Sequence, residues 1–376
     1  MRYRQLALCF TGADAASRRR LHFSKTFSNK FIRRQVMKKT LITLATLSAL
    51  AGTVQAQSNV TVYGQVDAGL RNLTNVDAAG DSQLSMSSGG TYHSNRFGFK
   101  GSEDLGNGLK AIFQLEGGFN SGTGVGNKGL FDRTAKVGIS GAYGTVSLGR
   151  QYTVAFDTIS AYDPMSYKYS GITLVMAATM GVRDSNIVKY EGKFGAFTAR
   201  AGYAAGEQTG GTSNGAKQAI GLSYDNGPIS LGGAYTQKKA NDGLGGDLEH
   251  YTMGGTYQIG AVKMSAGYAD QTLTVVGASD TSDKYAWVGA AYQFSPVLDL
   301  RTAYYQVKNS TANADGKKDV FIVSSVYSLS KRTVLYAEID NSKVSGATRF
   351  VDINNKDMIN SNKKQLGVSA GMVHYF

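Results

Sequence analysis

The chain has 376 residues, with 47 glycines, 3 prolines and 22 tyrosines, and its charged residues make up only 18 %, below the usual share of about a quarter. The formal net charge is +13, but residues 1–56 hold 11 of the 40 Lys and Arg and 1 of the 27 acids, so residues 57–376 carry 29 against 26, or +3. The basic excess therefore belongs to the front of the chain and does not indicate a nucleic-acid partner, while a mean hydropathy of -0.22 argues against a bundle of membrane helices.

The first predicted element is a signal peptide over 37–56. Lys38 and Lys39 form its basic start, the apolar run LITLATLSALAG over 41–52 forms its core, and Val-Gln-Ala at 54–56 supplies small residues at the cleavage spacing. Cleavage after Ala56 would leave residues 57–376 as the exported body.

Residues 1–36 are rich in Arg and Lys and show no strand period. We interpret residues 1–36 as an extension that results from a wrongly assigned start codon, with translation beginning at Met37. The alternative is an unusually long basic start of the signal peptide, and mapping the start codon separates the two. The single cysteine, Cys9, also lies here, so the exported body can form neither a disulfide nor a thiolate metal site.

From Val60 onward the chain is a series of short runs in which apolar residues alternate with small or polar ones. In the run over 60–71 the even positions are mostly apolar and the odd positions mostly polar. Period-two alternation of this kind predicts strands with two different faces. Similar runs occur at 197–203, 229–236 and 262–268.

The breaks between the runs alternate in length. Tight breaks with turn residues fall at 104–108, 141–144, 191–195, 225–228, 258–261, 294–297 and 329–332. Long polar breaks fall near 72–92, 120–130, 152–184, 206–216, 240–247, 271–282, 310–317 and 344–363. Seven tight turns and eight long loops separate sixteen strands.

An even strand number, with short turns at one end and long loops at the other, predicts an all-β fold: an up-and-down antiparallel transmembrane β-barrel of sixteen strands over 57–376. Such a sheet must close, because an open edge in lipid leaves backbone groups unpaired. Sixteen strands leave a water-filled lumen. The alternative is a soluble β-sandwich, whose loop lengths follow no strict rhythm.

The chain ends on GMVHYF, inside the last predicted strand. The parity of that strand turns Phe376 outward, toward the aromatic girdle on the periplasmic side. A terminal phenylalanine on an alternating strand is also similar to the signal that the outer-membrane assembly machinery reads. The simpler interpretation is a lipid-facing aromatic ring, and both can hold.

Several blocks of the body resemble the Gram-negative trimeric porins, in particular the general porins of beta-proteobacteria. The most specific block is SNRFGFKGSEDLGNGLKAIFQLEGGFN at 94–120, followed by FDRTAKVGISGAYGTVSLGRQY at 131–152 and LSKRTVLYA at 329–337. The resemblance implies a homotrimer of barrels in the outer membrane, passive diffusion of ions and small hydrophilic solutes, no cofactor, and contact with outer-membrane lipid and lipopolysaccharide.

The resemblance also implies that the loop after the fifth strand, here about 152–184, folds inward and narrows the pore. This loop lacks the Pro-Glu-Phe-Gly motif of the enterobacterial porins. In related porins, arginines on the barrel wall face acids on the inward loop. The corresponding selectivity residues here are Arg96, Arg133 and Arg183, with Lys136 nearby, and Glu116, Asp157 and Asp163 opposite them.

Parity supports an inward direction for Arg96 and Glu116, because Phe97, Phe99 and Leu115 beside them would face lipid. Lys136 has the inward parity too, since Val137 and Ile139 of its strand would face lipid. Arg133 shares parity with the apolar positions of its strand, so a bulge or a place at the strand end must turn it inward. A surplus of cations at the throat would make the pore moderately anion-preferring. The simpler interpretation is that each charged side chain in the lumen only keeps the pore hydrated and has no role in selectivity.

Two other classes of function stay open at this point. An outer-membrane enzyme needs a nucleophile and a base, and the exported body holds only His93, His250 and His374, with no Gly-x-Ser-x-Gly and no paired histidine spacing for a metal. We therefore expect no enzyme. A surface-binding or adhesion role through the long loops is the other alternative.

Overall fold

In the computed structural model the chain divides into two units, Met1–Gln55 and Ala56–Phe376. The structure describes residues 59–86, 91–168, 178–241, 246–274, 276–277, 279–311, 314–346 and 363–376. The predicted signal peptide and the extension before it lie outside the described residues and stay predictions.

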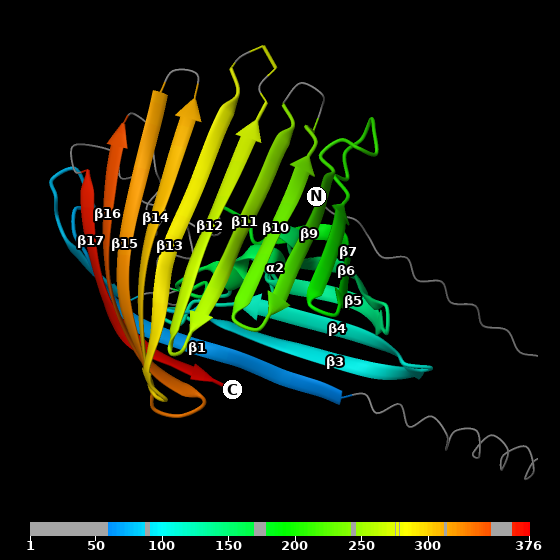
Figure 1. The fold of residues 1–376 in the computed structure, drawn as a ribbon, viewed down its shortest axis with the longest axis horizontal. Coiled ribbons are helices and arrows are strands. Elements are labelled where there is room, and N and C mark those ends of the chain that lie inside the picture. The colour runs from blue at the N-terminus through cyan, green and yellow to red at the C-terminus, as the bar shows by residue number, and fades with distance from the viewer. Residues whose placement is uncertain are drawn as a thin grey trace, which may run out of the picture. The chain divides into compact units, whose positions relative to one another are not determined.

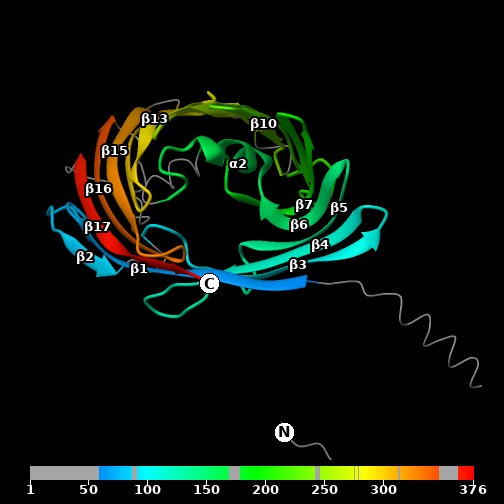
Figure 2. The same cartoon turned by 60° about the horizontal axis from the view of Figure 1, so that its bottom comes forward.

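The second unit is an antiparallel barrel of sixteen strands, as the alternation predicts (Figures 1 and 2). A further short strand, β2, lies in the first long loop and pairs with the end of β1. The strands are β1 (Asn59–Leu73), β2 (Gln83–Met86), β3 (Arg96–Gly106), β4 (Leu109–Gly118), β5 (Thr134–Gly141), β6 (Gly144–Tyr152), β7 (Arg183–Phe194), β8 (Phe197–Ala204), β9 (Lys217–Asn226), β10 (Ile229–Lys238), β11 (Leu248–Ile259), β12 (Val262–Leu273), β13 (Thr281–Ser295), β14 (Leu298–Thr311), β15 (Ala314–Ser328), β16 (Thr333–Gly346) and β17 (Lys364–Tyr375).

All seven predicted tight turns join neighbouring strands. Asn107, Gly227 and Gly260 have positive φ angles in three of them, which is the conformation that glycine and asparagine adopt most readily. The predicted loop at 310–317 is wrong in length, because β14 and β15 continue through most of it. Their ladder extends to the pair Thr311 and Ala314, since polar residues beyond the membrane can still form backbone hydrogen bonds.

The two faces of β1 show why the sequence alternates. Val62, Val66 and Leu70 are exposed on the outer face, where lipid would cover them, whereas Asp67 and Arg71 are buried on the lumen side. An outer face made of apolar side chains can contact lipid without the free-energy cost of taking polar side chains out of water. The local pattern therefore determines which face meets lipid.

The sheet closes where β17 pairs with β1, over a register that runs from Gln65 opposite Tyr375 to Leu73 opposite Gly367. Phe376 extends this ladder by one residue, because its N–H donates to the carbonyl of Gly64 at 3.0 Å and its carbonyl accepts from the Gly64 N–H at 3.0 Å. The ring of Phe376 occupies the space that a side chain at position 64 would need. The outward direction predicted for Phe376 agrees with its 49 % exposure.

On the lumen side, polar side chains reach from β1 to β16 across the intervening β17. The guanidinium of Arg71 donates twice to Asp340, at 2.7 and 3.0 Å, and once to Ser369 at 2.8 Å. A Cβ atom at Gly367 would collide with both ends of the ion pair. We call this arrangement the seam clamp, and it fastens β1 to β16 beside the closing pair of strands.

A second bridge runs parallel to the clamp. The Tyr336 hydroxyl on β16 donates to the Asp67 carboxylate on β1 at 2.6 Å. Side chains at Gly69 and Gly371 would overlap this hydroxyl, so glycine on β1 and on β17 leaves room for the tyrosine to cross. The closure of the barrel thus has side-chain as well as backbone support.

The loop between β6 and β7 folds into the barrel, where α2 (Val154–Ile159) and η1 (Ser160–Tyr162) lie inside the ring of strands (Figure 2). The indole of Trp287 donates to the Tyr162 carbonyl at 3.0 Å. Tyr162 packs over Gly232 and Gly254, and Pro164 packs over Gly289, where any Cβ atom would crowd them. Glycines on β10, β11 and β13 therefore let the inward loop approach the wall closely.

We expect the seam clamp to stabilise the barrel more than a similar ion pair elsewhere. Replacing the buried Asp340 by Asn leaves Glu338, 3.7 Å away, as the nearest carboxylate of the buried Arg71, so we expect a loss of stability that approaches the about 3 kcal/mol of a broken buried pair. The measurement is the free energy of unfolding in denaturant, together with the temperature at which the folded band disappears on an unheated gel.

The matched control is Asp184→Asn. Its partner Lys217 lies 2.8 Å away and the pair joins β7 to β9 across β8, away from the seam. Equal decreases in the free energy of unfolding for Asp340→Asn and Asp184→Asn would contradict the expectation that the seam clamp stabilises the barrel more than other ion pairs do.

Candidate functional site: a cationic throat

Glu116 on β4 is the centre of a charged cluster in the lumen. Its carboxylate lies 2.6 Å from Nε of Arg133, 3.9 Å from a guanidinium nitrogen of Arg96 and 3.7 Å from one of Arg183. The Tyr63 hydroxyl donates to it at 3.0 Å. The predicted arginines therefore come together, but Glu116 lies among them on the same wall and not opposite them.

Each arginine reaches the cluster from a strand end. Arg96 is the first residue of β3 and Arg183 the first of β7. Arg133 precedes β5, and its N–H donates to the carbonyl of Glu116 at 3.1 Å. Arg133 stands just before the first residue of β5, so the parity of that strand does not apply to it. Its side chain points into the lumen because of its place at the strand end, and not because of a bulge.

A cavity of about 440 Å³ opens beside the cluster, between the wall and the inward loop. Its lining includes Arg96, Arg133, Arg183 and Lys263, and no carboxylate from the described residues. Arg183 also lies over the ring of Tyr152, with its guanidinium carbon 4.4 Å from the ring centroid. A cation held against a ring keeps a fixed direction while its charge remains available.

Two further basic groups border this region. His93 approaches a guanidinium nitrogen of Arg96 at 3.0 Å, and burial, followed by the charges of Arg96, Lys168 and Arg133, lowers the pKa of His93 to about 2. Lys168 donates to the Tyr92 hydroxyl at 2.6 Å, and burial followed by the charge of Arg301 lowers its pKa to about 8. At neutral pH, His93 is therefore uncharged and Lys168 is mostly protonated.

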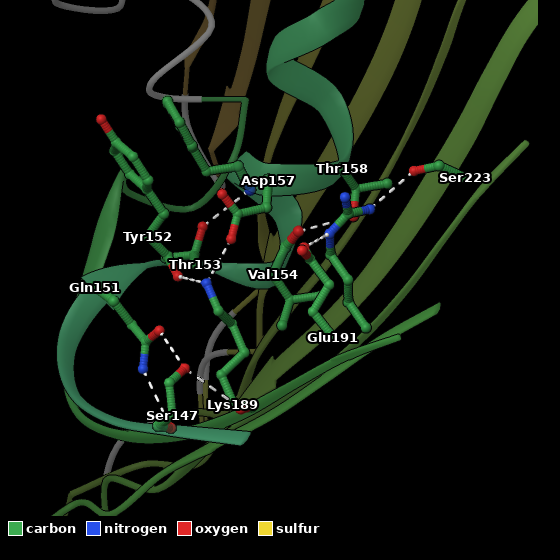
Figure 3. Close-up of polar contacts among 12 residues, drawn as sticks. Ser147, Gln151, Tyr152, Thr153, Val154, Asp157, Thr158, Lys189, Glu191 and Ser223 are labelled. Atoms are coloured by element: carbon green, nitrogen blue, oxygen red, sulfur yellow. Dashed lines mark hydrogen bonds and ion pairs between the residues drawn. The ribbon is translucent and has the colours of Figure 1, made fainter. Parts of the chain in front are cut away.

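Asp157 lies apart from the arginines. It stands on α2 and pairs with Lys189 of β7, whose ammonium group also donates to the Tyr152 carbonyl at 2.9 Å (Figure 3). Thr153 caps the same helix by accepting from the Phe156 N–H at 3.0 Å. Asp157 therefore anchors the inward loop to the wall.

Asp163 is likewise placed away from the predicted cluster. It lies on the inward loop, just after η1, and is buried where that loop meets β14, accepting from the Tyr305 hydroxyl and, at 2.6 Å, from the Tyr167 N–H. Burial raises the pKa of this carboxyl.

Lys136 on β5 faces the lumen opposite Gln114 and does not contact Glu116. The structure thus brings together four of the seven predicted selectivity residues.

The sequence patterns did not select Tyr63, Tyr152 or Lys263, all of which border the cluster or the cavity. Tyr63 and Lys263 have the lumen-facing parity of their strands, and this is a signal that could have found them. Tyr152 is the last residue of β6, where the inward loop begins. Its contact with the Arg183 guanidinium depends on the pairing of β6 with β7, which the sequence pattern does not reveal.

The described residues contain no group of three or more His, Cys, Asp or Glu that could hold a metal ion. None of the helices in the described part of the chain has both the length and the apolar character that a membrane crossing requires. His250, one of the three histidines of residues 57–376, is buried on β11 and contacts the Ala178 carbonyl at 2.7 Å.

Known proteins share this architecture. An outer membrane porin, protein 32 of Delftia acidovorans, is 35 % identical over 361 residues, which cover 90 % of this chain and 100 % of the relative. An outer membrane porin of Bordetella pertussis is 31 % identical over 359 residues, covering 80 % and 93 %.

Among solved structures, an anion-selective porin from Comamonas acidovorans superposes with a TM-score of 0.74 at 29 % identity, covering 85 % of this chain and 100 % of that one. The trimer form of OmpT from Vibrio cholerae, with a TM-score of 0.63 at 18 % identity and coverage of 85 % and 99 %, shares the fold.

The model of the Gram-negative porin family matches residues 43–347. The closed barrel, the inward loop and the charged throat are the parts that a diffusion channel needs. The chain belongs to the Gram-negative porin family, and it forms a channel for ions and small hydrophilic solutes in the outer membrane.

Proposed function

We propose that this porin is moderately anion-preferring and that the arginine cluster of its throat is the cause. The observation that supports this most directly is the lining of the cavity, which has four cationic side chains and no carboxylate from the described residues. A ring of one sign in a narrow, low-dielectric passage lowers the barrier for ions of the other sign. The exported body as a whole is nearly balanced at +3, so position and not net charge makes the preference.

Glu116 moderates this preference and holds the arginines in place. One carboxylate faces three guanidinium groups, so two positive charges remain uncompensated within the cluster. Within the described structure, Nε of Arg183 is buried and has no hydrogen-bond partner. The charge of this guanidinium attracts an anion in the throat, although its buried Nε is not itself reached from the lumen.

We expect the double substitution Arg96→Ser and Arg133→Ser to move the reversal potential toward the cation-selective sign. Under a tenfold KCl gradient the native value should lie between zero and the ~59 mV of a perfectly selective pore. It should shrink as salt rises, because charges are screened over roughly 10 Å at about 0.1 M salt.

The matched control is Arg332→Ser, which removes an exposed positive charge from a tight turn. It should leave the reversal potential unchanged. A cation-selective native pore, or a double variant that behaves like the control, would contradict the assignment of these arginines to the throat.

The anion preference should also fall as the pH rises from 7 to 9. Lysine is charged below its pKa and neutral above it, and the pKa of Lys168 is lowered to about 8, so this range removes its charge. Between pH 5.5 and 7 neither Lys168 nor the neutral His93 changes its charge. Reversal potentials measured at pH 6, 7 and 9 test this, and Lys168→Met should be insensitive to the change from 7 to 9. A native pore with the same preference at pH 7 and 9 would refute the role of Lys168.

We further propose that the channel works as a homotrimer and that Phe376 is read by the outer-membrane assembly machinery. Small residues on the outer face, such as Ala68, Ala199 and Ala201, permit close approach of another copy. The trimer form of OmpT from Vibrio cholerae, which shares the fold, supports the same assembly for this chain.

Deleting Phe376 should leave most of the protein unfolded in the periplasm, because the ring and the last backbone pair with Gly64 are lost together. The folded fraction should still run as a trimer on unheated gels and after cross-linking. Met372→Ala, which truncates another outward residue of β17, is the control and should assemble normally. Native levels of folded trimer after deletion of Phe376 would refute the assembly role, and a native protein that cross-links only as a monomer would refute the trimer.

A further inference from the structure

Arg96 is the arginine of the throat that Glu116 holds least closely. The nearest guanidinium nitrogen of Arg96 lies 3.9 Å from the Glu116 carboxylate, whereas Nε of Arg133 lies 2.6 Å from it. A hydrogen bond between a charged nitrogen and a carboxylate is about 2.7–2.9 Å long. Arg96 and Glu116 therefore attract each other without a hydrogen bond that would fix the direction of the Arg96 side chain.

Two groups of the residues just before β3 hold the Arg96 guanidinium instead. Its Nη2 donates to Nε2 of His93 at 3.0 Å, and its Nε donates to the Ser94 carbonyl at 3.4 Å. A guanidinium has donors and no acceptor, so Nε2 of His93 is the acceptor of the first bond. The direction of the Arg96 side chain thus depends on where His93 and Ser94 stand.

The segment 91–95, which carries both acceptors, lies beside a gap in the pairing of β1. β3 pairs with β1 only up to the pair of Gln65 and Arg96, and β2 pairs with it only from Leu70 onward. Residues 66–69 of β1 therefore have no described strand on this side. Buried backbone groups without partners are costly, so other groups have to complete β1 here.

Side chains from two connections complete the backbone of Asp67 in this gap. Its N–H donates to Oδ1 of Asn95 at 2.5 Å, and its carbonyl accepts from the Ser121 hydroxyl at 2.6 Å. Asp67 and Asn95 are both buried. The polar side chain of Asn95 therefore stands where the next strand is missing, and it docks the segment 91–95 on β1.

The Asp67 carboxylate then fixes the backbone of the segment. Its Oδ2 accepts from the Tyr92 N–H at 2.9 Å and from the His93 N–H at 2.6 Å. The side-chain amide of Gln65, which shares the lumen face of β1, donates to the Ser94 carbonyl at 2.8 Å. Hydrogen bonds to an ionised acceptor are stronger than those between neutral groups. Asp67 is therefore the main anchor of the backbone at 92–94.

The other oxygen of the same carboxylate serves the closure of the barrel. Oδ1 of Asp67 accepts from the Tyr336 hydroxyl, the bridge to β16 described above. The Tyr336 ring also stacks on the ring of Tyr92, with the centroids 5.1 Å apart and 17° between the planes. One oxygen of Asp67 thus faces the closing strands and the other faces the segment that leads to Arg96. Because of this division, the two contacts can be removed separately.

We propose that Asp67 is a positioning residue for the selectivity of the throat. Through the backbone at 92–94 it places the two acceptors that hold the Arg96 guanidinium in the passage. The Asp67 side chain is fully buried, so a permeating anion does not meet it. This role rests on the anion preference proposed above, and it makes part of that preference depend on hydrogen bonds outside the passage.

The test is a double-mutant cycle on the purified, folded, full-length porin in planar bilayers, with the reversal potential under a KCl gradient as the readout. Arg96→Ser is introduced into the native protein and into Asp67→Ala, which lacks both carboxylate oxygens. The shift that Arg96→Ser causes should fall to about half or less in Asp67→Ala, because residues of one hydrogen-bond network have non-additive effects. A role of Asp67 in folding alone predicts equal shifts in both backgrounds.

Tyr336→Phe is the matched control, because it removes the hydrogen bond of the other carboxylate oxygen and keeps the ring that stacks on Tyr92. In this background Arg96→Ser should cause its full shift. Asp67→Asn separates the hydrogen bonds from the charge. Its amide oxygen can accept from the two N–H groups and its amide nitrogen can donate to the Tyr336 hydroxyl, so it should also give the full shift. A shift as small as that in Asp67→Ala would overturn the positioning role in favour of the carboxylate charge.

His93→Leu guards against misfolding of Asp67→Ala, since it removes an acceptor of Arg96 and leaves β1 unchanged. It should reduce the effect of Arg96→Ser in the same way. Full shifts in both Asp67→Ala and His93→Leu would overturn the positioning role and leave the anion preference standing. If Asp67→Ala yields no folded barrels, a full shift in His93→Leu alone overturns it. An Arg96→Ser variant with the native reversal potential would instead overturn the proposed function and the positioning role together.

Discussion

The closure of the sheet between β1 and β17 is the constraint on which the rest of the molecule depends. An open edge in lipid would leave a row of backbone donors and acceptors unpaired, so no lumen, throat or outer face exists until these strands meet. The chain strengthens this junction from within, where Arg71 reaches Asp340 and Tyr336 reaches Asp67 across β17. Glycines at 69, 367 and 371 make this possible, because any larger side chain would occupy the path of the crossing groups.

Closure creates a lumen too wide to be filled by wall side chains alone, and the inward loop reduces it. The loop packs against one side of the barrel through Tyr162, Trp287 and Tyr305, so the space that remains open lies toward the arginines of β3, β5 and β7. Apolar packing on one side and a charged, hydrated passage on the other follow from the same loop. The position of the throat is therefore decided by where the loop finds glycines on the wall.

The charges of the molecule act by position. Residues 57–376 have almost no net charge, yet their cations gather in the throat, where one carboxylate lies among three arginines, and along the outer rim, where lysines face each other across strands. In the throat, the Glu116 carboxylate that lies among the arginines reduces their mutual repulsion.

The sequence by itself determined the barrel, since strand direction, turn position and the lipid-facing side all follow from local rules. Period-two alternation gave the outward valines of β1, turn residues gave the seven tight connections, and parity gave the inward course of Arg96 and Glu116. Only the tertiary structure decided which charges meet. Asp157 pairs with Lys189 and Asp163 with Tyr305, while Glu116 lies among the arginines, and the 310–317 segment pairs as strand. These outcomes depend on the path of a loop through the lumen and on contacts between residues far apart in the chain, and a local pattern contains no information about either.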